Sequence, residues 1–420
     1  MGMKILAATA MLSIGILPAV STIARAAEPD DLKLPPGFHA TIVAEGLGES
    51  ARHLAFRDAS HLYVSTERQS KDAPNMGIIA LHLNAKHVAD KTEHFSTIDN
   101  GTGIAIYKGA LYTTSADTLY RFKFKGDELV PSAAPEVIVT NVPGRAAIAF
   151  DDKNNLFVAA GGIGNVCAPP GTPRNVKTVG PRPCPVLETR AGVWRFDAMK
   201  PGQNWSNGEH YATGIRDTNA LAFAHGTLYA VLYGRDQAEK AYPEIISAEA
   251  GAHVADEMFK VEKGTDMGWP YTHYDSALKI RLDAPEYGGD GKTPVTDPKY
   301  AVPVAAFPAH VAPMDVVFYN GKQFPMEFRG GAFIPMHGAG NTDPVGHDDG
   351  FNVMFVPFGK DGAAQMPMVF ADGFAGPTRD DKNAKRARYR PAGVTVGPDG
   401  ALYVSESQKG RIWRIAYTGG

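Results

Sequence analysis

The chain has 420 residues, of which 44% are hydrophobic and 21% are charged, and its formal net charge is −3 at pH 7. This charge balance argues against nucleic acid as a partner and gives no general attraction to anionic membranes. The hydrophobic content is ample for a core, so the composition is that of a globular protein.

The first 26 residues have the pattern of a secretory signal peptide. A basic start at Lys4 precedes an apolar stretch from Ile5 to Val20, and Ala24-Arg25-Ala26 forms an A-x-A cleavage site. The apolar stretch is short for a membrane span, which needs roughly 20 residues, and no second run of that length follows it. The sequence therefore predicts a cleaved signal peptide at residues 1–26, a periplasmic location and no membrane span.

A pattern of two strands joined by a short turn recurs six times in the remaining residues. The copies read "HLAFRDASHLYVSTE", "GIAIYKGALYTTS", "AIAFDDKNNLFVAAG", "ALAFAHGTLYAVLYG", "DVVFYNGKQFPMEFRGGAFIPMHG" and "GVTVGPDGALYVSES". The early copies are spaced by about 45 residues, which is typical of propeller blades, and the later spacings are longer. We predict an all-β fold, a single six-bladed β-propeller domain over residues 27–420, with long loops in the later blades.

The chain has only two cysteines, Cys167 and Cys184, in a proline-rich segment. Two cysteines in an oxidising compartment favour a disulfide, and a soft-metal site would need further Cys or His residues nearby. We therefore predict a structural Cys167–Cys184 disulfide.

Polar and charged residues gather in the segments that flank the repeated strands, where they could converge on the central channel of a propeller. The segments are "TGIRDTNALAF" with Arg216 and Asp217, "LYGRDQ" with Gly234, Arg235 and Asp236, "ADEMF" with Asp256 and Glu257, "AHVAPMDVVFY" with His310, "MHGAGN" with His337 and Asn341, and "RARYRPAG" with Arg386, Arg388 and Arg390. Purely structural interpretations exist for three of these groups: a solvated charged loop for Arg386, Arg388 and Arg390, structural histidines for His310 and His337, and a turn cap or structural calcium site for Asp256 and Glu257.

Together these segments resemble the glucose/sorbosone dehydrogenase family, the soluble quinoproteins that use pyrroloquinoline quinone (PQQ). The similarity runs from "LKLPPGFHATIVAEGLGESARHLAF" through "TGIRDTNALAF", "GTDMGWPY" and "HVAPMDVVFYNGKQFPMEFRGGAFIPMHGAGN" to "RARYRPAGVTVGPDGALYVSESQKGRIWRI", and is greatest to the sorbosone dehydrogenase branch. It implies a PQQ-dependent dehydrogenase with Ca²⁺ that oxidises an aldose or aldehyde sugar and passes electrons to a periplasmic acceptor.

The resemblance also implies roles for individual residues. Arg388 and Arg390 match the arginines that pair with cofactor carboxylates, a task that suits planar guanidinium groups. Arg216 matches the catalytic arginine near the reactive quinone carbonyl, and Asp217 stands where the family has Asn. The Ca²⁺ ligands are predicted at Gly234, Arg235 and Asp236, chiefly through backbone carbonyls. Asn341 is predicted as a further cofactor contact.

The family's general base, a histidine seven residues before the position of Phe150, has no counterpart, because Pro143 stands there. General-base catalysis is typically worth 10²–10⁴-fold, so a replacement matters. His310 and His337 are the predicted candidates. Two other classes of function stay open: a Ca²⁺-dependent lactonase-type hydrolase that uses Asp217, Asp236, Asp256 and Glu257, and a non-catalytic ligand-binding propeller that has lost its base.

Overall fold

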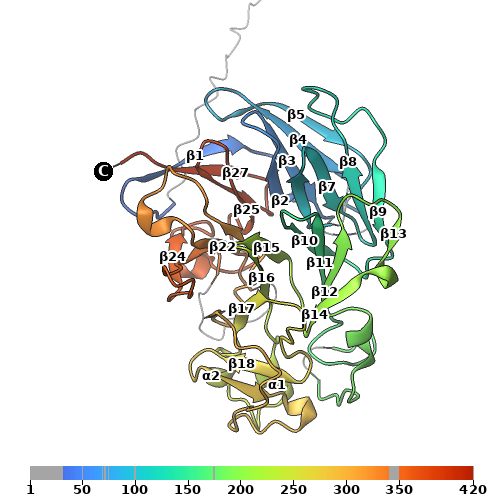
Figure 1. The fold of residues 1–420 in the computed structure, drawn as a ribbon. Coiled ribbons are helices and arrows are strands. Elements are labelled where there is room, and N and C mark those ends of the chain that lie inside the picture. Colours follow the sequence, from blue (N-terminus) through green and yellow to red (C-terminus); the bar gives the residue numbers. More distant parts are fainter. Residues whose placement is uncertain are drawn as a thin grey trace, which may run out of the picture.

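The computed structural model describes residues 32–49, 51–68, 70, 72–73, 75–98, 101–173, 176–339 and 350–419. Six blades, each with four antiparallel strands, follow one another around a ring (Figure 1), so the predicted six-bladed β-propeller is confirmed. The signal peptide predicted at residues 1–26 and the cofactor contact predicted at Asn341 lie outside the described residues.

Each blade runs from an inner strand at the channel to an outer strand at the rim. Blade 1 comprises β2 (Ala51–Phe56), β3 (His61–Thr66), β4 (Ile78–Leu83) and β5 (Ala89–Phe95). Blade 2 comprises β6 (Ile104–Tyr107), β7 (Ala110–Thr114), β8 (Thr118–Phe122) and β9 (Glu136–Thr140), with β13 (Gln203–Asn204) added at its edge. Blade 3 comprises β10 (Ala146–Phe150), β11 (Asn155–Ala160), β12 (Gly192–Asp197) and β14 (Glu209–Thr213).

The last three blades have the same antiparallel order. Blade 4 comprises β15 (Ala220–Ala224), β16 (Thr227–Leu232), β17 (Asp256–Val261) and β20 (Ala305–Phe307). Blade 5 comprises β21 (Val317–Phe318), β22 (Ala332–Met336), β23 (Asn352–Val356) and β24 (Met368–Ala371). Blade 6 comprises β25 (Pro391–Val396), β26 (Leu402–Glu406), β27 (Ile412–Tyr417) and β1 (Phe38–Ala44).

The other elements lie in the loops. The hairpin of β18 (Thr272–Asp275) and β19 (Ile280–Asp283) forms an outgrowth with the short helices α1 (Ala238–Ala241) and α2 (Ala248–Gly251), beside blade 4 in Figure 1. Single 3₁₀ turns occur at Pro185–Glu188, Trp205–Asn207, Pro285–Tyr287, Met326–Phe328 and Arg379–Asp381. No helix in the described part of the chain is long and apolar enough to cross a membrane.

The ring is closed by two segments from opposite ends of the chain. β1 pairs with β27 antiparallel, in register from Phe38 opposite Tyr417 to Ile42 opposite Trp413. Phe38 of β1 is also anchored in the core. Its ring packs edge-on against the rings of Phe324 and Phe370, with ring centroids 4.7 Å and 5.1 Å apart. The first strand is therefore held both by the sheet of blade 6 and by side chains of blade 5.

The inner strands β2, β6, β10, β15, β21 and β25 enclose a central channel. A cavity of about 440 Å³ is lined mainly by the later residues of these strands, such as Phe56, Tyr107 and Phe150. Because all six strands run in the same direction relative to the channel, the residues just before them meet at its other end.

Replacement of Phe38 by Ala is expected to lower the free energy of unfolding by about 3–5 kcal/mol, the usual cost of truncating a buried aromatic ring. Chemical denaturation of Phe38→Ala and of the wild type would measure the difference. Met366→Ala is the matched control, because that side chain is 82% exposed. Equal effects of the two substitutions would contradict the part given to Phe38 in ring closure.

Candidate active site

A cavity of about 540 Å³ opens at the end of the channel where the inner strands begin. We call it the polar cavity. It is lined by Arg52, Glu67, Arg145, Arg216, Asp217, Asn219, Tyr233, Asp236, Gln237, Asp256, His310, Ala312, Met314, His337, Gly338, Ala339 and Arg390. Its size is within the range of about 300–1,000 Å³ that small-molecule sites usually have.

The propeller repeat explains why these residues meet. Arg145, Arg216 and Arg390 come just before the inner strands β10, β15 and β25, and Arg52 is the second residue of β2. The remaining groups mostly follow the second strand of a blade, as Glu67 follows β3. Since the second strand is antiparallel to the first, its end lies beside the start of the inner strand. Both sets of residues therefore reach the same face of the ring.

One side of the polar cavity is an ordered group of Arg216, Asp236, His310 and Asn165. Asp236 accepts a hydrogen bond from Arg216 Nη2 at 2.5 Å through Oδ2, and its Oδ1 lies 3.2 Å from His310 Nδ1. Asn165 fixes the same group, because its Oδ1 accepts from Arg216 Nε and from the Asp236 amide, each at 3.1 Å. Burial lowers the pKa of His310, but Asp236 outweighs burial and leaves this pKa raised above its ordinary value.

The Asp236 contact also sets the tautomer of His310. An ionised carboxylate can only accept hydrogen bonds, so His310 Nδ1 carries the proton in this contact. Nε2 is then the nitrogen with the lone pair whenever the ring is neutral, and no hydrogen bond of Nε2 occurs within the described residues. This arrangement resembles that of a general base whose other ring nitrogen is held by a carboxylate.

The loop that carries His310 is attached to the neighbouring loop by Asp256. The Asp256 carboxylate accepts the Gly234 amide at 2.6 Å and the Ala312 amide at 2.9 Å. His310 and Ala312 have positive φ angles of 66° and 54°, a conformation that costs energy for residues other than glycine. Asp256 therefore holds a strained segment in place. Burial raises the pKa of Asp256 to about 7, although both amides and His310 favour its charged form.

The opposite side of the polar cavity has an excess of positive charge. Glu67 pairs with Arg52 at 3.1 Å and with Arg145 at 2.5 Å, so one carboxylate serves two arginines. Arg390 donates only to backbone carbonyls, of His337 at 3.0 Å and of Gly338 at 2.6 Å, as far as the described residues extend. Burial, and then the charge of Arg52, lower the pKa of Arg390 to about 10, which leaves it protonated at neutral pH.

His337 lies between these arginines and is an unsuitable base. Its Nε2 contacts Ser407 Oγ at 2.7 Å, and its carbonyl oxygen is the one that Arg390 binds. Burial, and then the charges of Arg390 and Arg52, hold the pKa of His337 well below its ordinary value. The ring therefore stays neutral, and its contacts are those of a positioning residue.

The structure brings together seven residues that were singled out from the sequence, and separates others. The seven that line the polar cavity are Arg216, Asp217, Asp236, Asp256, His310, His337 and Arg390. Arg388 instead lines a small pocket with Lys33 and Tyr389. Residues two apart share a face only within one continuous strand. Here the Arg388 amide donates to the Ala375 carbonyl, and the chain then turns into β25 at Pro391.

The calcium ligands predicted at Gly234 and Arg235 are backbone carbonyls, and the side-chain and amide contacts of these residues involve other atoms. The Gly234 amide donates to Asp256, and the Arg235 side chain pairs with the buried Glu286. Both Asp236 carboxylate oxygens already have partners in Arg216 and His310, so the calcium site stays a prediction that rests on the backbone carbonyls of this segment. Glu257, named above for a hydrolase, pairs with Arg281 at 2.6 Å and does not line the polar cavity.

Arg52, Arg145, Asn165 and Tyr233 were missed from the sequence. Arg145 carried a usable signal, because it precedes the strand "AAIAF" much as Arg216 precedes "ALAF", and it lies two residues after Pro143. Asn165 had no such signal, since it belongs to the cysteine loop. The predicted disulfide is confirmed, with 5.9 Å between the Cα atoms of Cys167 and Cys184. Asn165 lies two residues before Cys167, in the same connection between β11 and β12.

Comparisons with known proteins agree with this architecture. A sequence model of the TrAA12-like family matches residues 32–271 and 292–418. The chain belongs to the TrAA12-like family. An uncharacterized protein of Borreliella burgdorferi is 23% identical over 416 residues, which is 95% of this chain and 94% of that relative.

Two solved structures share the fold of this TrAA12-like protein. One is a Trichoderma reesei protein of carbohydrate-active enzyme family AA12, with a TM-score of 0.72, 17% identity and coverage of 94% of this chain and 99% of that one. The other is the PQQ domain of pyranose dehydrogenase from Coprinopsis cinerea in its holo form, with a TM-score of 0.70, 17% identity and coverage of 93% and 98%. The likeness to quinoprotein sugar dehydrogenases is thus confirmed for the fold, and the sorbosone branch stays a prediction.

Asp256 predicts a pH dependence of stability in the TrAA12-like protein. Its pKa is about 7 in the folded state and about 3.9 in an unfolded chain, so the folded state binds this proton more tightly. The stabilisation is fully present below the unfolded pKa and is lost as pH rises through about 7. The unfolding midpoint in urea should therefore fall less steeply between pH 4 and pH 8 in Asp256→Asn than in the wild type.

Asp290→Asn is the control for this measurement. Backbone and hydroxyl hydrogen bonds from Thr293 lower the pKa of Asp290 to about 2, so this group titrates below the tested range. If the unfolding midpoint changed with pH equally in Asp256→Asn, in Asp290→Asn and in the wild type, the raised pKa of Asp256 would be contradicted.

Proposed function

We propose that this protein is a periplasmic quinoprotein oxidoreductase, which uses PQQ with Ca²⁺ to oxidise an aldose or a related aldehyde sugar. The observation that carries the proposal is the cationic side of the polar cavity, where Arg52, Arg145 and Arg390 outnumber the two described carboxylates beside them, Glu67 and Asp217. A surplus of positive charge in a partly buried cavity is costly unless an anion compensates it. The TrAA12-like family membership and the PQQ domain among the structural neighbours support the choice of anion.

The residues present suit PQQ, which is a flat molecule with three carboxylates and an o-quinone. Arg390 is held at two of its nitrogens by carbonyls, so its orientation is fixed while its charge stays available to a ligand. Guanidinium groups bind carboxylates through paired hydrogen bonds, which gives both strength and orientation. Arg390, Arg52 and Arg145 would hold the carboxylates, and Arg216 would lie on the side of His310.

The bound cofactor would supply the acceptor for the hydride that leaves the carbon bearing the substrate hydroxyl. His310 would take the hydroxyl proton on Nε2, so that loss of hydride and proton converts the alcohol carbon to a carbonyl. Asp236 orients the imidazole and stabilises the imidazolium that forms, and Arg216 holds Asp236 in turn. This role for His310 replaces the base that Pro143 does not provide.

Removal of the Arg390 guanidinium is expected to weaken PQQ binding by about 10- to 100-fold, because a hydrogen bond to a charged group contributes about 1.5–3 kcal/mol. Titration of Arg390→Gln with PQQ in the presence of Ca²⁺, followed by absorbance and by calorimetry, measures the change. Arg388→Gln is the matched control, since Arg388 lines a different pocket. An equal loss in both variants, or no PQQ bound by the wild type, would overturn the cofactor assignment and make lactone hydrolysis the next assay.

Loss of the base should separate binding from turnover. The His310→Gln variant is expected to retain PQQ. Sugar should reduce the bound PQQ about 10²–10⁴-fold more slowly in this variant than in the wild type. The measurement is the absorbance change from quinone to quinol after addition of aldoses, sorbosone and simple aldehydes. His94→Gln, at an exposed histidine of β5 on the rim, is the control and should react like the wild type. A wild-type protein that binds PQQ but is reduced by no sugar would favour a ligand-binding propeller.

A further inference from the structure

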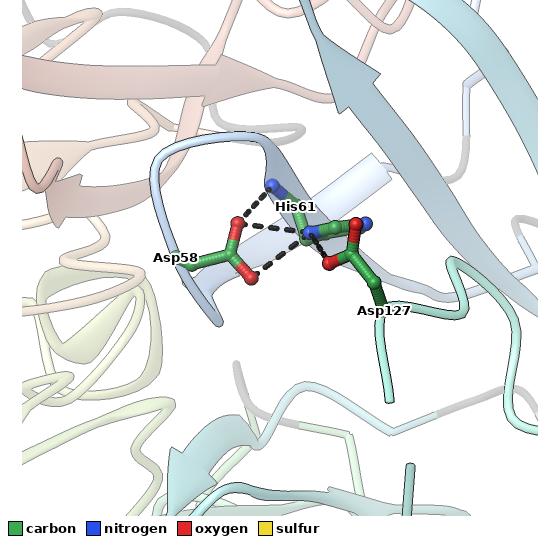
Figure 2. A group of neighbouring side chains, drawn as sticks. All are labelled: Asp58, His61 and Asp127. Atoms are coloured by element: carbon green, nitrogen blue, oxygen red, sulfur yellow. Dashed lines mark hydrogen bonds and ion pairs between the residues drawn. The ribbon is translucent and has the colours of Figure 1, made fainter. Parts of the chain in front are cut away.

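We propose a second, non-catalytic site for a first-row divalent metal ion, formed by Asp58, His61 and Asp127 on the face of the ring opposite the polar cavity (Figure 2). His61 begins β3, and Glu67 of the polar cavity follows the other end of that strand. Asp58 lies in the β2–β3 turn of blade 1, and Asp127 lies in the β8–β9 loop of blade 2. An ion here would therefore bind two blades to each other, far from any step of the oxidation.

The three side chains converge on one ring nitrogen. His61 Nδ1 lies 2.8 Å from Asp58 Oδ1, 2.9 Å from Asp58 Oδ2 and 3.9 Å from Asp127 Oδ1. One ligand atom from each residue can be chosen so that all lie within 4.8 Å of one another. Bonds of about 2.0–2.2 Å from imidazole and carboxylate to Zn²⁺ need only a modest inward rotation of Asp127.

The two inner ligands are fixed by the turn that they close. Asp58 Oδ1 accepts the amides of Ser60 at 2.9 Å and of His61 at 3.1 Å. The side chain of His61 is 3% exposed, so its ring has little freedom to turn away. The nitrogen and the first carboxylate are thus held in position without an ion.

The third ligand is delivered by a loop that is docked independently of any ion. Arg57 donates to the carbonyls of Gly126 at 2.5 Å and Glu128 at 2.7 Å, which flank Asp127 on both sides. The Arg57 guanidinium also lies 4.4 Å from the ring centroid of Phe124, and Tyr63 Oη donates to the Leu129 carbonyl at 2.9 Å. A loop fixed at its backbone on both sides of the ligand is what a preorganised metal site requires.

The Asp127 side chain is 91% exposed, and among the described residues the ion pair that it makes is the one with His61. Two carboxylates face a single imidazole, with Arg57 Nε 3.7 Å from Asp58 as the nearby compensating charge. This leaves a local excess of negative charge that a dication would neutralise.

The ligand set selects the kind of ion. One imidazole nitrogen and two carboxylates suit Zn²⁺, Co²⁺ or Mn²⁺, whereas Ca²⁺ prefers six to eight oxygen ligands. The ion would displace the proton that His61 Nδ1 shares with Asp58, and water would complete the coordination. Three protein ligands with open positions predict moderate affinity and one ion per chain.

A neighbouring pair provides the comparison. His82 lies opposite His61 in the β3–β4 ladder, and its Nδ1 contacts Asp90 Oδ1 at 2.6 Å, but no second carboxylate faces it among the described residues. If a histidine–aspartate pair were enough to bind the ion, His82 would bind it as well as His61. The third ligand is therefore the feature to test.

The experiment compares full-length wild-type protein, Asp127→Ala and His82→Asn by equilibrium dialysis against Zn²⁺ at neutral pH, with Co²⁺ absorbance as the spectroscopic probe. The proposal expects one equivalent of Zn²⁺ fewer in Asp127→Ala than in the wild type, and no loss in His82→Asn. Subtraction removes any ion bound elsewhere, and the exposed Asp127 side chain can be truncated without unfolding the protein. Equal stoichiometry in wild type and Asp127→Ala, or a loss in His82→Asn alone, would overturn the proposal.

Discussion

The pairing of β1 with β27 is the constraint on which the polar cavity depends. The cavity draws side chains from blades 1, 3, 4, 5 and 6, so its shape is defined only when the ring is complete. Arg52 lies in blade 1 and Arg390 at the start of blade 6, and these two blades meet where the ends of the chain are joined. Charge repulsion between their arginines opposes the closure, and the aromatic packing of Phe38 in blades 5 and 6 favours it.

Inside the ring, desolvation gives each charged group of the cavity a distinct role. Asp236 is paired with Arg216 and His310, and acts by orienting them. Asp256 accepts hydrogen bonds from two backbone amides instead of pairing with a cation. Through one of them its carboxylate holds the strained segment from His310 to Ala312. Arg390 is held by carbonyls, which orient a guanidinium without neutralising it. Charged residues of the same cavity thus orient a neighbouring side chain, hold a loop or present a charge to a ligand, according to their hydrogen-bond partners.

Much of the fold was predictable from the sequence, because the repeat of strand, turn and strand is a local pattern that each blade expresses separately. The convergence of Arg216, Asp236, His310 and Arg390 followed from their positions beside the repeated strands. The position of Arg388 was not predictable in this way. Its backbone hydrogen-bonds to the loop after β24, which interrupts the extended conformation that the prediction assumed. Asp127 and His61 carry no joint signal, because only the docking of blade 2 on blade 1 brings them together.

The two faces of the ring therefore differ in charge. On one face, arginines outnumber carboxylates along the side of the polar cavity formed by Glu67 and Arg390, so this side lacks negative charge. On the other face, Asp58 and Asp127 share one imidazole, so this group lacks positive charge. An anionic cofactor on the first face and a metal ion on the second would each supply the missing charge.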